Sequence, residues 1–402
     1  MATACAAPES SVVAPPEAAP AGGPVVAVGV ATSAPRVTVG GGDALRLRSA
    51  EGRPLGAIAA GRTASASATG SGITLISDDG RDPAPTTVIV TPIGGDGLVR
   101  VDGRDYRGTV ELRRDGRGLT VVDRVGLESY LAGVVSAELG VFPEGDDQAV
   151  MAQAVVSRTY AMRNLGRWRA QGFDLAADVG DQRYDGAGGE TPQAWRAVRA
   201  TTGQILTWQG RPIDAFFHST CGGRTADATE VFSGGSRPYL RSVADVDRDG
   251  LPYCRISPRY QWREAWSGSE LVAALRRSLP AESGVPAAAI REVRSIGVAS
   301  RSSSGRVASL QIDLGGRTVT VTGAAVRRVL IPPGQDLLRS AAFTLSAERR
   351  SGQVTALVAE GHGSGHGVGL CQWGAIGRAR AGQRYPEILR AYFPGTVLTR
   401  QY

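Results

Sequence analysis

The chain has 402 residues, 42% of them apolar and 21% charged, which is the composition of a globular protein with a sizeable core. Its formal net charge of +7 comes from arginine side chains and favours an anionic partner, such as an acidic wall polymer or a membrane surface. The sequence has no aromatic RNA-binding signature and no zinc-finger spacing, which argues against nucleic acid. It also has no run of about 18 apolar residues, so no transmembrane helix is predicted.

The first 24 residues are rich in alanine and proline and are predicted to form a disordered leader. They lack the charged and apolar regions of a complete signal peptide. The alternative is that Thr3, Ala4 and Cys5 are the end of a lipoprotein signal whose apolar stretch precedes the printed start. In that case Cys5 is the residue that becomes lipidated.

Residues 25–92 contain short alternating apolar runs separated by Gly and Asp turns, a pattern typical of β-strands. Strands of the same kind continue to about residue 125. The period then changes, and 127–139 has apolar residues at helical spacing. Asp146 and Asp147 are N-cap candidates for a second helix that ends before Gly166.

Arg158 falls in the middle of the apolar arc of this second helix, where a core residue belongs. A guanidinium is rarely buried without a carboxylate or a similar partner. We therefore expect the helix face to border a polar cleft. The alternative is a structural ion pair with an acid such as Glu138.

Both helical and strand patterns occur through the rest of the chain. Helices are predicted at 191–201, 269–278, 286–290 and 385–392, and strands at 204–208, 213–217, 292–299, 307–314, 318–322 and 354–360. Asp245, Asp247 and Asp249 resemble part of a calcium loop but lack its terminal glutamate, so this segment is interpreted as a turn.

All three histidines lie in glycine-rich segments. His218 begins His-Ser-Thr-Cys-Gly-Gly, and His362 and His366 lie where every second residue from Gly361 to Gly369 is glycine. This spacing argues against a helix and against an ordinary packed strand. It indicates a backbone that passes close to a ligand or to another strand, and it makes the segment a candidate active-site wall.

The cysteines beyond the leader are Cys221, Cys254 and Cys371. In a protein outside the cytoplasm the simplest arrangement is a Cys221–Cys254 disulfide with Cys371 free. A zinc site made by His218 and Cys221 with Cys254 or Cys371 is one alternative, and a nucleophilic dyad of Cys371 with a histidine is another.

Glu138 lies at the end of an otherwise apolar stretch. A carboxylate among apolar neighbours has a raised proton affinity, which suits a general acid. The alternative, which is the more usual one for a single glutamate, is a position on the helix surface.

Seven segments of this chain, in the same order, resemble the SpoIID/LytB domain family. They are residues 127–138, 149–161, 181–186, 218–225, 237–240, 361–375 and 385–395. The resemblance covers about residues 95–400, and residues 25–90 resemble the β-rich extension of some members. It implies an α+β fold, with a β-rich SpoIID-like catalytic domain carrying several helices at 93–402 and a small β extension at 25–92.

The resemblance also implies a peptidoglycan lytic transglycosylase, which cleaves between N-acetylmuramic acid and N-acetylglucosamine and leaves 1,6-anhydro ends. The catalytic glutamate of its Val-Val-x-x-Glu segment maps to Glu138. The alternative is a non-catalytic wall-binding protein that enhances a cell-wall amidase. No cofactor is expected, although some members carry a zinc site.

Further residues of the matching segments are expected to line the glycan cleft, with the glycine-rich segment facing Glu138. They are Arg158, Gln182, Tyr184, Ser219, His362, His366 and Gln372. The expected location is extracytoplasmic, in secreted or lipid-anchored form. The expected partners are peptidoglycan strands and, in the alternative function, an amidase, with no nucleic acid and with a membrane contacted only through the lipid.

Overall fold

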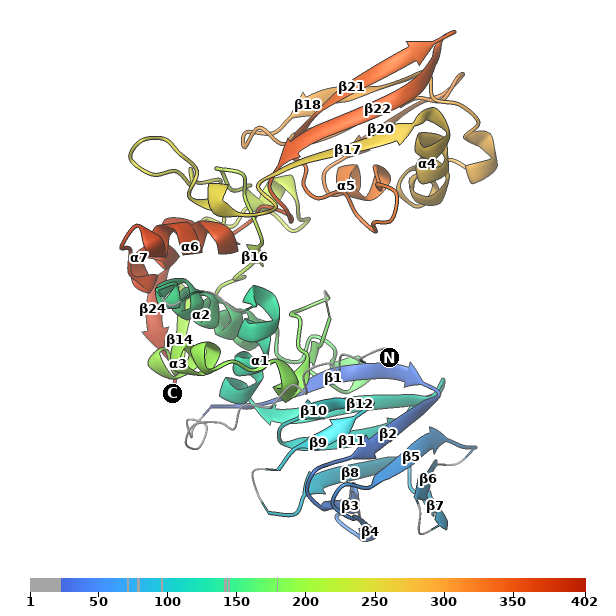
Figure 1. Cartoon of the computed structure of the whole chain (residues 1–402), viewed down its shortest axis with the longest axis vertical. Coiled ribbons are helices and arrows are strands. Elements are labelled where there is room, and N and C mark those ends of the chain that lie inside the picture. The colour runs from blue at the N-terminus through green and yellow to red at the C-terminus, as the bar shows by residue number, and fades with distance from the viewer. Residues whose placement is uncertain are drawn as a thin grey trace, which may run out of the picture. The chain divides into compact units, whose positions relative to one another are not determined.

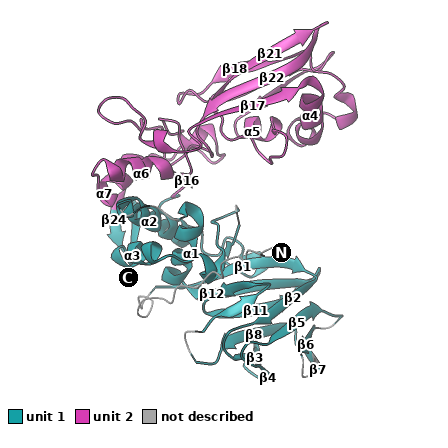
Figure 2. Ribbon diagram, viewed as in Figure 1, with its two compact units in different colours: residues 1–214, 398–402 teal, residues 215–397 magenta. Residues whose placement is uncertain are grey.

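The computed structural model describes residues 23–402 except 71, 78–79, 95–96, 141–142, 144 and 179. The fold divides into two compact units, shown in teal and magenta in Figure 2. Unit 1 comprises the chain up to Asp214 together with Leu398–Tyr402, and unit 2 comprises Ala215–Val397. Cys5 and most of the predicted leader lie outside the described residues. Among the described residues, no helix is both long and apolar enough to cross a membrane.

Two antiparallel sheets make up the β-rich part of unit 1 (Figure 1). The strands of the first, in spatial order, are β13 (Leu175–Ala176), β1 (Val25–Ala34), β12 (Leu119–Gly126), β11 (Thr109–Arg114), β8 (Thr87–Pro92), β3 (Leu45–Ser49) and β4 (Pro54–Ile58); only β13 joins its neighbour in parallel. Those of the second are β10 (Arg104–Tyr106), β9 (Val99–Val101), β2 (Arg36–Gly40), β5 (Thr63–Ala68), β6 (Ile73–Ser77) and β7 (Gly80–Ala84). Strands from both sides of residue 93 share the first sheet, and the family-domain boundary expected there stays a prediction.

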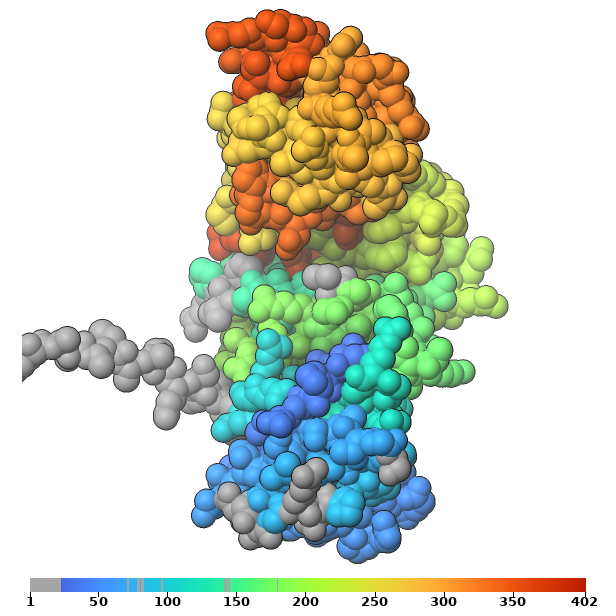
Figure 3. All heavy atoms as spheres, turned by 90° about the vertical axis from the view of Figure 1, so that its right-hand side faces the viewer, coloured from blue at the N-terminus to red at the C-terminus, as the bar shows by residue number. Residues whose placement is uncertain are grey.

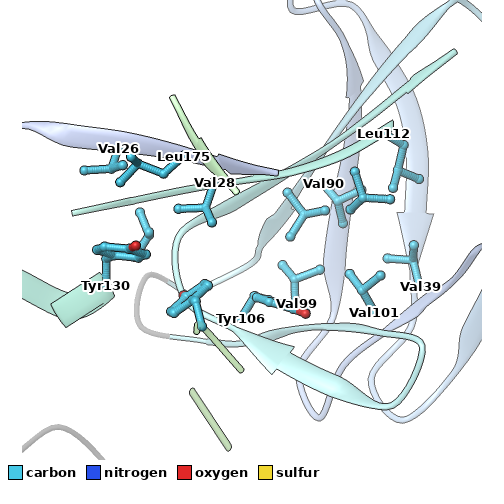
Figure 4. Close-up of a cluster of buried hydrophobic side chains, with 14 of the residues drawn as sticks. Val26, Val28, Val39, Val90, Val99, Val101, Tyr106, Leu112, Tyr130 and Leu175 are labelled. Atoms are coloured by element: carbon cyan, nitrogen blue, oxygen red, sulfur yellow. The ribbon is translucent and has the colours of Figure 1, made fainter. Parts of the chain in front are cut away.

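Valines from both sheets and Tyr130 from helix α1 (Leu127–Leu139) belong to one hydrophobic core (Figure 4). The alternation expected from the sequence is confirmed in β2, where Val37 and Val39 are buried while Arg36 and Thr38 are exposed. In the space-filling view the blue to cyan residues of these strands form one closely packed body (Figure 3).

The helical part of unit 1 follows the predicted elements closely. The helix expected at 127–139 is α1, and the second is α2 (Asp147–Asn164), which begins after Asp146. Helix α3 (Pro192–Ala200) has Pro192 in its first turn, and the Thr191 side chain accepts a hydrogen bond from the Ala194 amide. Strand β14 (Gln204–Trp208) lies between β15 (Arg211–Pro212) and the C-terminal β24 (Val397–Arg400).

Unit 2 contains two three-stranded antiparallel sheets within its described residues. One has the order β17 (Gln261–Ser267), β22 (Gln353–His362), β21 (Phe343–Arg350), and the other β18 (Ser295–Arg301), β19 (Val307–Asp313), β20 (Thr318–Thr322). Helices α4 (Gly268–Ser283) and α5 (Ala325–Val329) pack against strands of these sheets (Figure 1). Strands β17 and β21 were not predicted, and the helix expected at 286–290 is a single 3₁₀ turn.

The rest of unit 2 includes a short parallel strand pair and two helices. Strand β16 (Phe217–His218) pairs with β23 (Leu370–Cys371), which leads directly into α6 (Gln372–Arg380). Helix α7 (Tyr385–Tyr392) follows and confirms the last helix predicted from the sequence.

A buried ion pair joins α1 to α2. The Arg158 guanidinium is fully buried and binds both oxygens of the Glu128 carboxylate along one edge, Nε to Oε1 at 2.9 Å and Nη2 to Oε2 at 2.6 Å. The Tyr402 hydroxyl, at the C-terminus, donates to the same Oε1 at 2.5 Å. This is the structural ion pair weighed as the alternative, but its acid is Glu128 rather than Glu138.

The remaining N–H groups of Arg158 are also occupied. They donate to the Gln204 carbonyl at 3.1 Å, the Val198 carbonyl at 3.2 Å and Thr201 Oγ1 at 3.4 Å. All five donors of the guanidinium therefore have protein partners, and none is left for a glycan. The expectation that Arg158 lines a substrate cleft is wrong, because the side chain links α1, α2, the end of α3 and β14.

A second buried acid lies beneath α1. Asp123, on β12, is fully buried and accepts a hydrogen bond from the Tyr184 hydroxyl at 2.8 Å. Burial raises the pKa of the Asp123 carboxyl to about 8, and the Tyr184 hydrogen bond opposes that rise. Gly133 of α1 leaves room for the tyrosine, since a Cβ there would lie 2.7 Å from the Tyr184 ring.

We expect Arg158→Met to lower the free energy of unfolding of unit 1 by about 3–5 kcal/mol, because Glu128 then stays buried without its countercharge. Amide hydrogen exchange along α2 measures this loss. Arg163→Met is the matched control on the same helix, since its exposed pair with Asp214 contributes about 0–1 kcal/mol. A loss below about 1 kcal/mol in Arg158→Met would contradict the assigned role.

The raised pKa of Asp123 predicts a pH dependence of stability. Between about pH 4 and pH 8 the folded state holds a proton on Asp123 that the unfolded chain releases, so stability falls as the pH rises through this window. The slope from this group is at most about 1.4 kcal/mol per pH unit. Asp123→Asn removes it, and the thermal midpoint of the variant relative to the parent protein should increase from pH 5 to pH 8. A constant difference across the range would refute this assignment.

Candidate functional site

Glu138 lies in the last turn of α1, just before the chain leaves the helix at Gly140. The helix is buried from Leu127 to Ser136, and burial decreases at its end, so the Glu138 side chain is half-buried. Its Oε1 accepts a hydrogen bond of 2.8 Å from the Arg183 backbone N–H. The carboxyl group is thus held by the backbone of a separate loop while it keeps access to solvent.

The environment raises the pKa of the Glu138 carboxyl above its usual range. Burial is the main cause, and the charge of Asp185 adds to it. The Arg183 backbone N–H and the Arg183 charge act in the opposite direction without cancelling the rise. A raised pKa keeps a larger protonated fraction near neutral pH, which a general acid requires.

The loop that contacts Glu138 is anchored by Asp181. This carboxylate accepts hydrogen bonds from Trp168 Nε1 at 2.6 Å, Arg167 Nη1 at 2.8 Å, the Ala176 amide at 2.8 Å and the Tyr160 hydroxyl at 2.9 Å. Four donors from separate parts of unit 1 therefore fix the start of the segment 181–186. Asp181 begins one of the family segments but was not among the residues predicted for the site.

Gln182 and Tyr184, both expected in the cleft wall, are almost completely buried on either side of Arg183. The Tyr184 hydroxyl donates a hydrogen bond to Asp123 in the core. Tyr184 therefore packs beneath the loop, and its hydroxyl is not available to a glycan. Gln182 Oε1 accepts a 3.4 Å hydrogen bond from Tyr130, while its Nε2 has no partner among the described residues. Arg183 is exposed and forms an ion pair at 2.8 Å with the half-buried Asp185.

The other expected site residues belong to unit 2. His366 Nε2 donates to the Phe217 carbonyl at 2.8 Å, and its Nδ1 accepts from the Val368 amide at 3.1 Å. His218 Nδ1 donates to the Val368 carbonyl at 3.1 Å, and its Nε2 has no partner among the described residues. Burial lowers the pKa of His366 to about 4 and also lowers the pKa of His218, so both rings are neutral near pH 7.

The glycines of the double-histidine segment are required by its contact with another part of the backbone. Gly363, Gly365 and Gly369 have positive φ angles. A Cβ would lie 2.5 Å from the Thr220 carbonyl oxygen at Gly363 and 2.1 Å from the Phe216 carbonyl oxygen at Gly369. Of the two explanations offered by the sequence, a ligand or another strand, the structure shows the second.

The last three expected wall residues differ in their exposure to solvent. His362 is exposed and lines a cavity of about 740 Å³ together with Trp262, Arg263 and Phe343. Ser219 is half-buried, with its hydroxyl 3.2 Å from the Thr220 hydroxyl. Gln372 is buried at the start of α6, and its Nε2 has no partner among the described residues.

The cysteines do not form the expected disulfide. Cys221 and Cys254 are buried free thiols with their sulfur atoms 3.6 Å apart, beyond the bonding distance of about 2.05 Å. Cys371 and Asp245 join them in one cluster, and His218 is not a member. Cys371 Sγ accepts hydrogen bonds from the Cys221 and Gly374 amides, and within the described chain no histidine is among its hydrogen-bond partners, so the Cys–His dyad has no support.

The expected site residues thus divide between the two units. Glu138, Arg158, Gln182 and Tyr184 lie in unit 1, whereas Ser219, His362, His366 and Gln372 lie in unit 2. The expectation that the glycine-rich segment faces Glu138 stays a prediction.

A match to a known protein family includes the segments that carry Glu138 and the loop that contacts it. The sequence model of the SpoIID family, described as stage II sporulation protein, matches residues 115–208, and that of a domain of unknown function matches 253–369. An uncharacterized protein of Brachyspira hyodysenteriae is 33% identical over 296 residues, or 73% of this chain and 72% of that protein.

Two relatives have descriptive names. Stage II sporulation protein D of Bacillus amyloliquefaciens is 28% identical over 298 residues, or 69% of this chain and 75% of that protein. An amidase enhancer of Bacillus subtilis is 25% identical over 327 residues, or 75% of this chain and 45% of that protein. These matches, together with the α+β fold, show that the chain belongs to the SpoIID family.

Proposed function

We propose that this protein is a peptidoglycan lytic transglycosylase in which Glu138 acts first as the acid and then as the base. The observation that carries the proposal is the environment of Glu138: a half-buried carboxyl with a raised pKa, held by the Arg183 N–H at the end of a buried helix. The position lies inside the segment matched by the SpoIID family. We place the activity outside the cytoplasm, at the cell wall.

The hydrogen bond from the Arg183 N–H makes the two carboxyl oxygens of Glu138 chemically different. Oε1 accepts the backbone N–H, so it already carries a hydrogen-bond donor and is the poorer place for a proton. The proton therefore resides on Oε2, which is the oxygen that faces the substrate in this proposal. The protonated Oε2 donates to the oxygen that links N-acetylmuramic acid to N-acetylglucosamine.

Bond cleavage and ring closure then need only this one carboxyl group. The bond between C1 of N-acetylmuramic acid and the linking oxygen breaks, and its electron pair goes to that oxygen. The C6 hydroxyl of the same sugar attacks C1 and gives its proton to the Glu138 carboxylate. The product is a 1,6-anhydro end, Glu138 regains its proton, and no water or second carboxylate is required.

A non-catalytic role as an amidase enhancer is the second candidate, and the relative of that name supports it. In that role the protein binds wall polymer through its basic surface and stimulates a cell-wall amidase, in keeping with the net charge of +7. The two candidates differ in what Glu138 does, because a purely binding protein does not need its proton.

Glu138→Gln should lower the formation of 1,6-anhydro-N-acetylmuramic acid from peptide-free glycan strands by about 10²–10⁴-fold. The amide oxygen still accepts the Arg183 N–H, so the thermal midpoint should stay unchanged. Mass spectrometry of the products measures the rate. Glu51→Gln, an equal charge change at an exposed position of unit 1, is the control and should keep full activity. Undiminished product from Glu138→Gln would refute the catalytic assignment and leave the enhancer role.

Asp185→Asn should shift the alkaline limb of the activity profile to lower pH. The active form has Glu138 protonated, so activity falls as the pH rises through its pKa. Asp185 raises that pKa and also neutralises part of the Arg183 charge, so its removal lowers the pKa on both counts. The measurement is kcat/KM against pH for both proteins. An alkaline limb that does not move would contradict the role given to Asp185.

A further inference from the structure

Three segments that are distant in the sequence bring four metal-ligating side chains together in unit 2. Cys221 follows β16, Asp245 and Cys254 lie in the next loop region, and Cys371 ends β23. The ligand atoms of all four lie within 4.8 Å of one another, and all four residues are buried. We propose that Cys221, Asp245, Cys254 and Cys371 bind one Zn²⁺ ion in a structural site.

The distances fit a single tetrahedral ion. Zn–S bonds of about 2.3 Å place two sulfur ligands about 3.8 Å apart around one zinc ion. The Cys221 and Cys254 sulfurs are 3.6 Å apart, and Cys221 Sγ lies 3.2 Å from Asp245 Oδ2. Three sulfurs and one carboxylate oxygen are a ligand set that zinc accepts.

Backbone amides point at the sulfur atoms, as they do around metal-bound thiolates. Cys371 Sγ accepts from the Cys221 amide at 3.1 Å and from the Gly374 amide at 3.2 Å. Cys221 Sγ accepts from the Gly223 amide at 3.3 Å. These donors stabilise negative charge on sulfur, and a buried group of such anions needs a cation among them.

Two hydrogen bonds to its other oxygen orient the Asp245 carboxylate. Its Oδ1 accepts from the Tyr392 hydroxyl at 2.8 Å and from Arg378 Nε at 2.9 Å, which turns Oδ2 toward the sulfurs. Gly374 is needed for this packing, since a Cβ there would lie 2.1 Å from Oδ2 and 2.2 Å from the Tyr392 hydroxyl oxygen. Outer partners of this kind fix the geometry of metal ligands.

The four buried ligands leave no open coordination position, which is the arrangement of a structural rather than a catalytic zinc. The ion would join β16 to β23 and α6 across the 150 residues that separate Cys221 from Cys371. It would thereby hold together the turn that carries Ser219 and the glycine-rich segment. His218 takes no part, because its Nδ1 donates to the Val368 carbonyl.

The first test is the metal content of the full chain, purified without chelators and analysed by mass spectrometry for metals. We expect about one zinc per chain. After exchange with Co²⁺, the absorption spectrum should show the ligand-field bands of a tetrahedral ion and a thiolate-to-cobalt charge-transfer band. Removal of the metal should lower the thermal midpoint, and added zinc should restore it. Metal-free protein that added zinc does not stabilise would overturn the proposal, as would a Cys221–Cys254 disulfide found by peptide mapping.

Variants separate metal binding from simple packing. Cys254→Ser should lose most of the zinc, whereas the control Cys5→Ser, at a cysteine that is not one of the four proposed ligands, should keep it. Cys254→Ser places a hydroxyl in a buried cluster and can destabilise the fold by itself, so Asp245→Cys is the second variant. It should retain one metal and strengthen the thiolate-to-cobalt band. An Asp245→Cys protein with an unchanged cobalt spectrum would exclude Asp245 as a ligand. None of these measurements uses glycan cleavage, so they stand apart from the proposed function.

Discussion

The organisation of unit 1 depends on the buried pairing of Arg158 with Glu128. A guanidinium in the core is tolerated only when its charge and its N–H groups are matched, and here both conditions are met by groups from α1, α2, the end of α3 and β14. The C-terminal Tyr402 contacts the same carboxylate, so the chain end is tied to the helices. The pair fixes the start of α1, and the rigid helix then determines where Glu138 lies at its other end.

Three carboxyl groups associated with α1 show how environment divides their roles. Glu128 is paired with a cation at the start of the helix. Asp123 is buried, and the Tyr184 hydroxyl is its one side-chain hydrogen-bond donor among the residues that the structure describes. Its raised pKa leaves it largely protonated at neutral pH. Glu138 lies at the boundary between core and solvent, where partial burial raises its pKa and the Arg183 backbone holds it. Only the third combines an available proton with access for a substrate, which is why the proposed chemistry is placed there.

Two of the histidines of unit 2, His218 and His366, contribute to packing. His366 has both ring nitrogens bonded to backbone, and it and His218 are kept neutral by burial. The glycines around His366 allow their segment to lie against residues 216–222. The same contact brings Cys371 to Cys221, so the segment that first suggested an active site supports the proposed metal site. Catalysis by Glu138 and the metal site are thus assigned to different units.

The sequence alone determined the local elements, the family and the position of Glu138, because periodicity and short motifs are encoded by neighbouring residues. Helix α1 and the alternating burial of β2 were predicted from such patterns. Long-range partners were not predicted: Arg158 was expected to border a polar cleft, but it pairs with Glu128, 30 residues away. The disulfide was likewise wrong, and Asp245 was interpreted as part of a turn although it lies beside the cysteines. Only the tertiary structure decides such pairings, because residues up to 150 positions apart meet through chain folding, which leaves no periodic trace in the sequence.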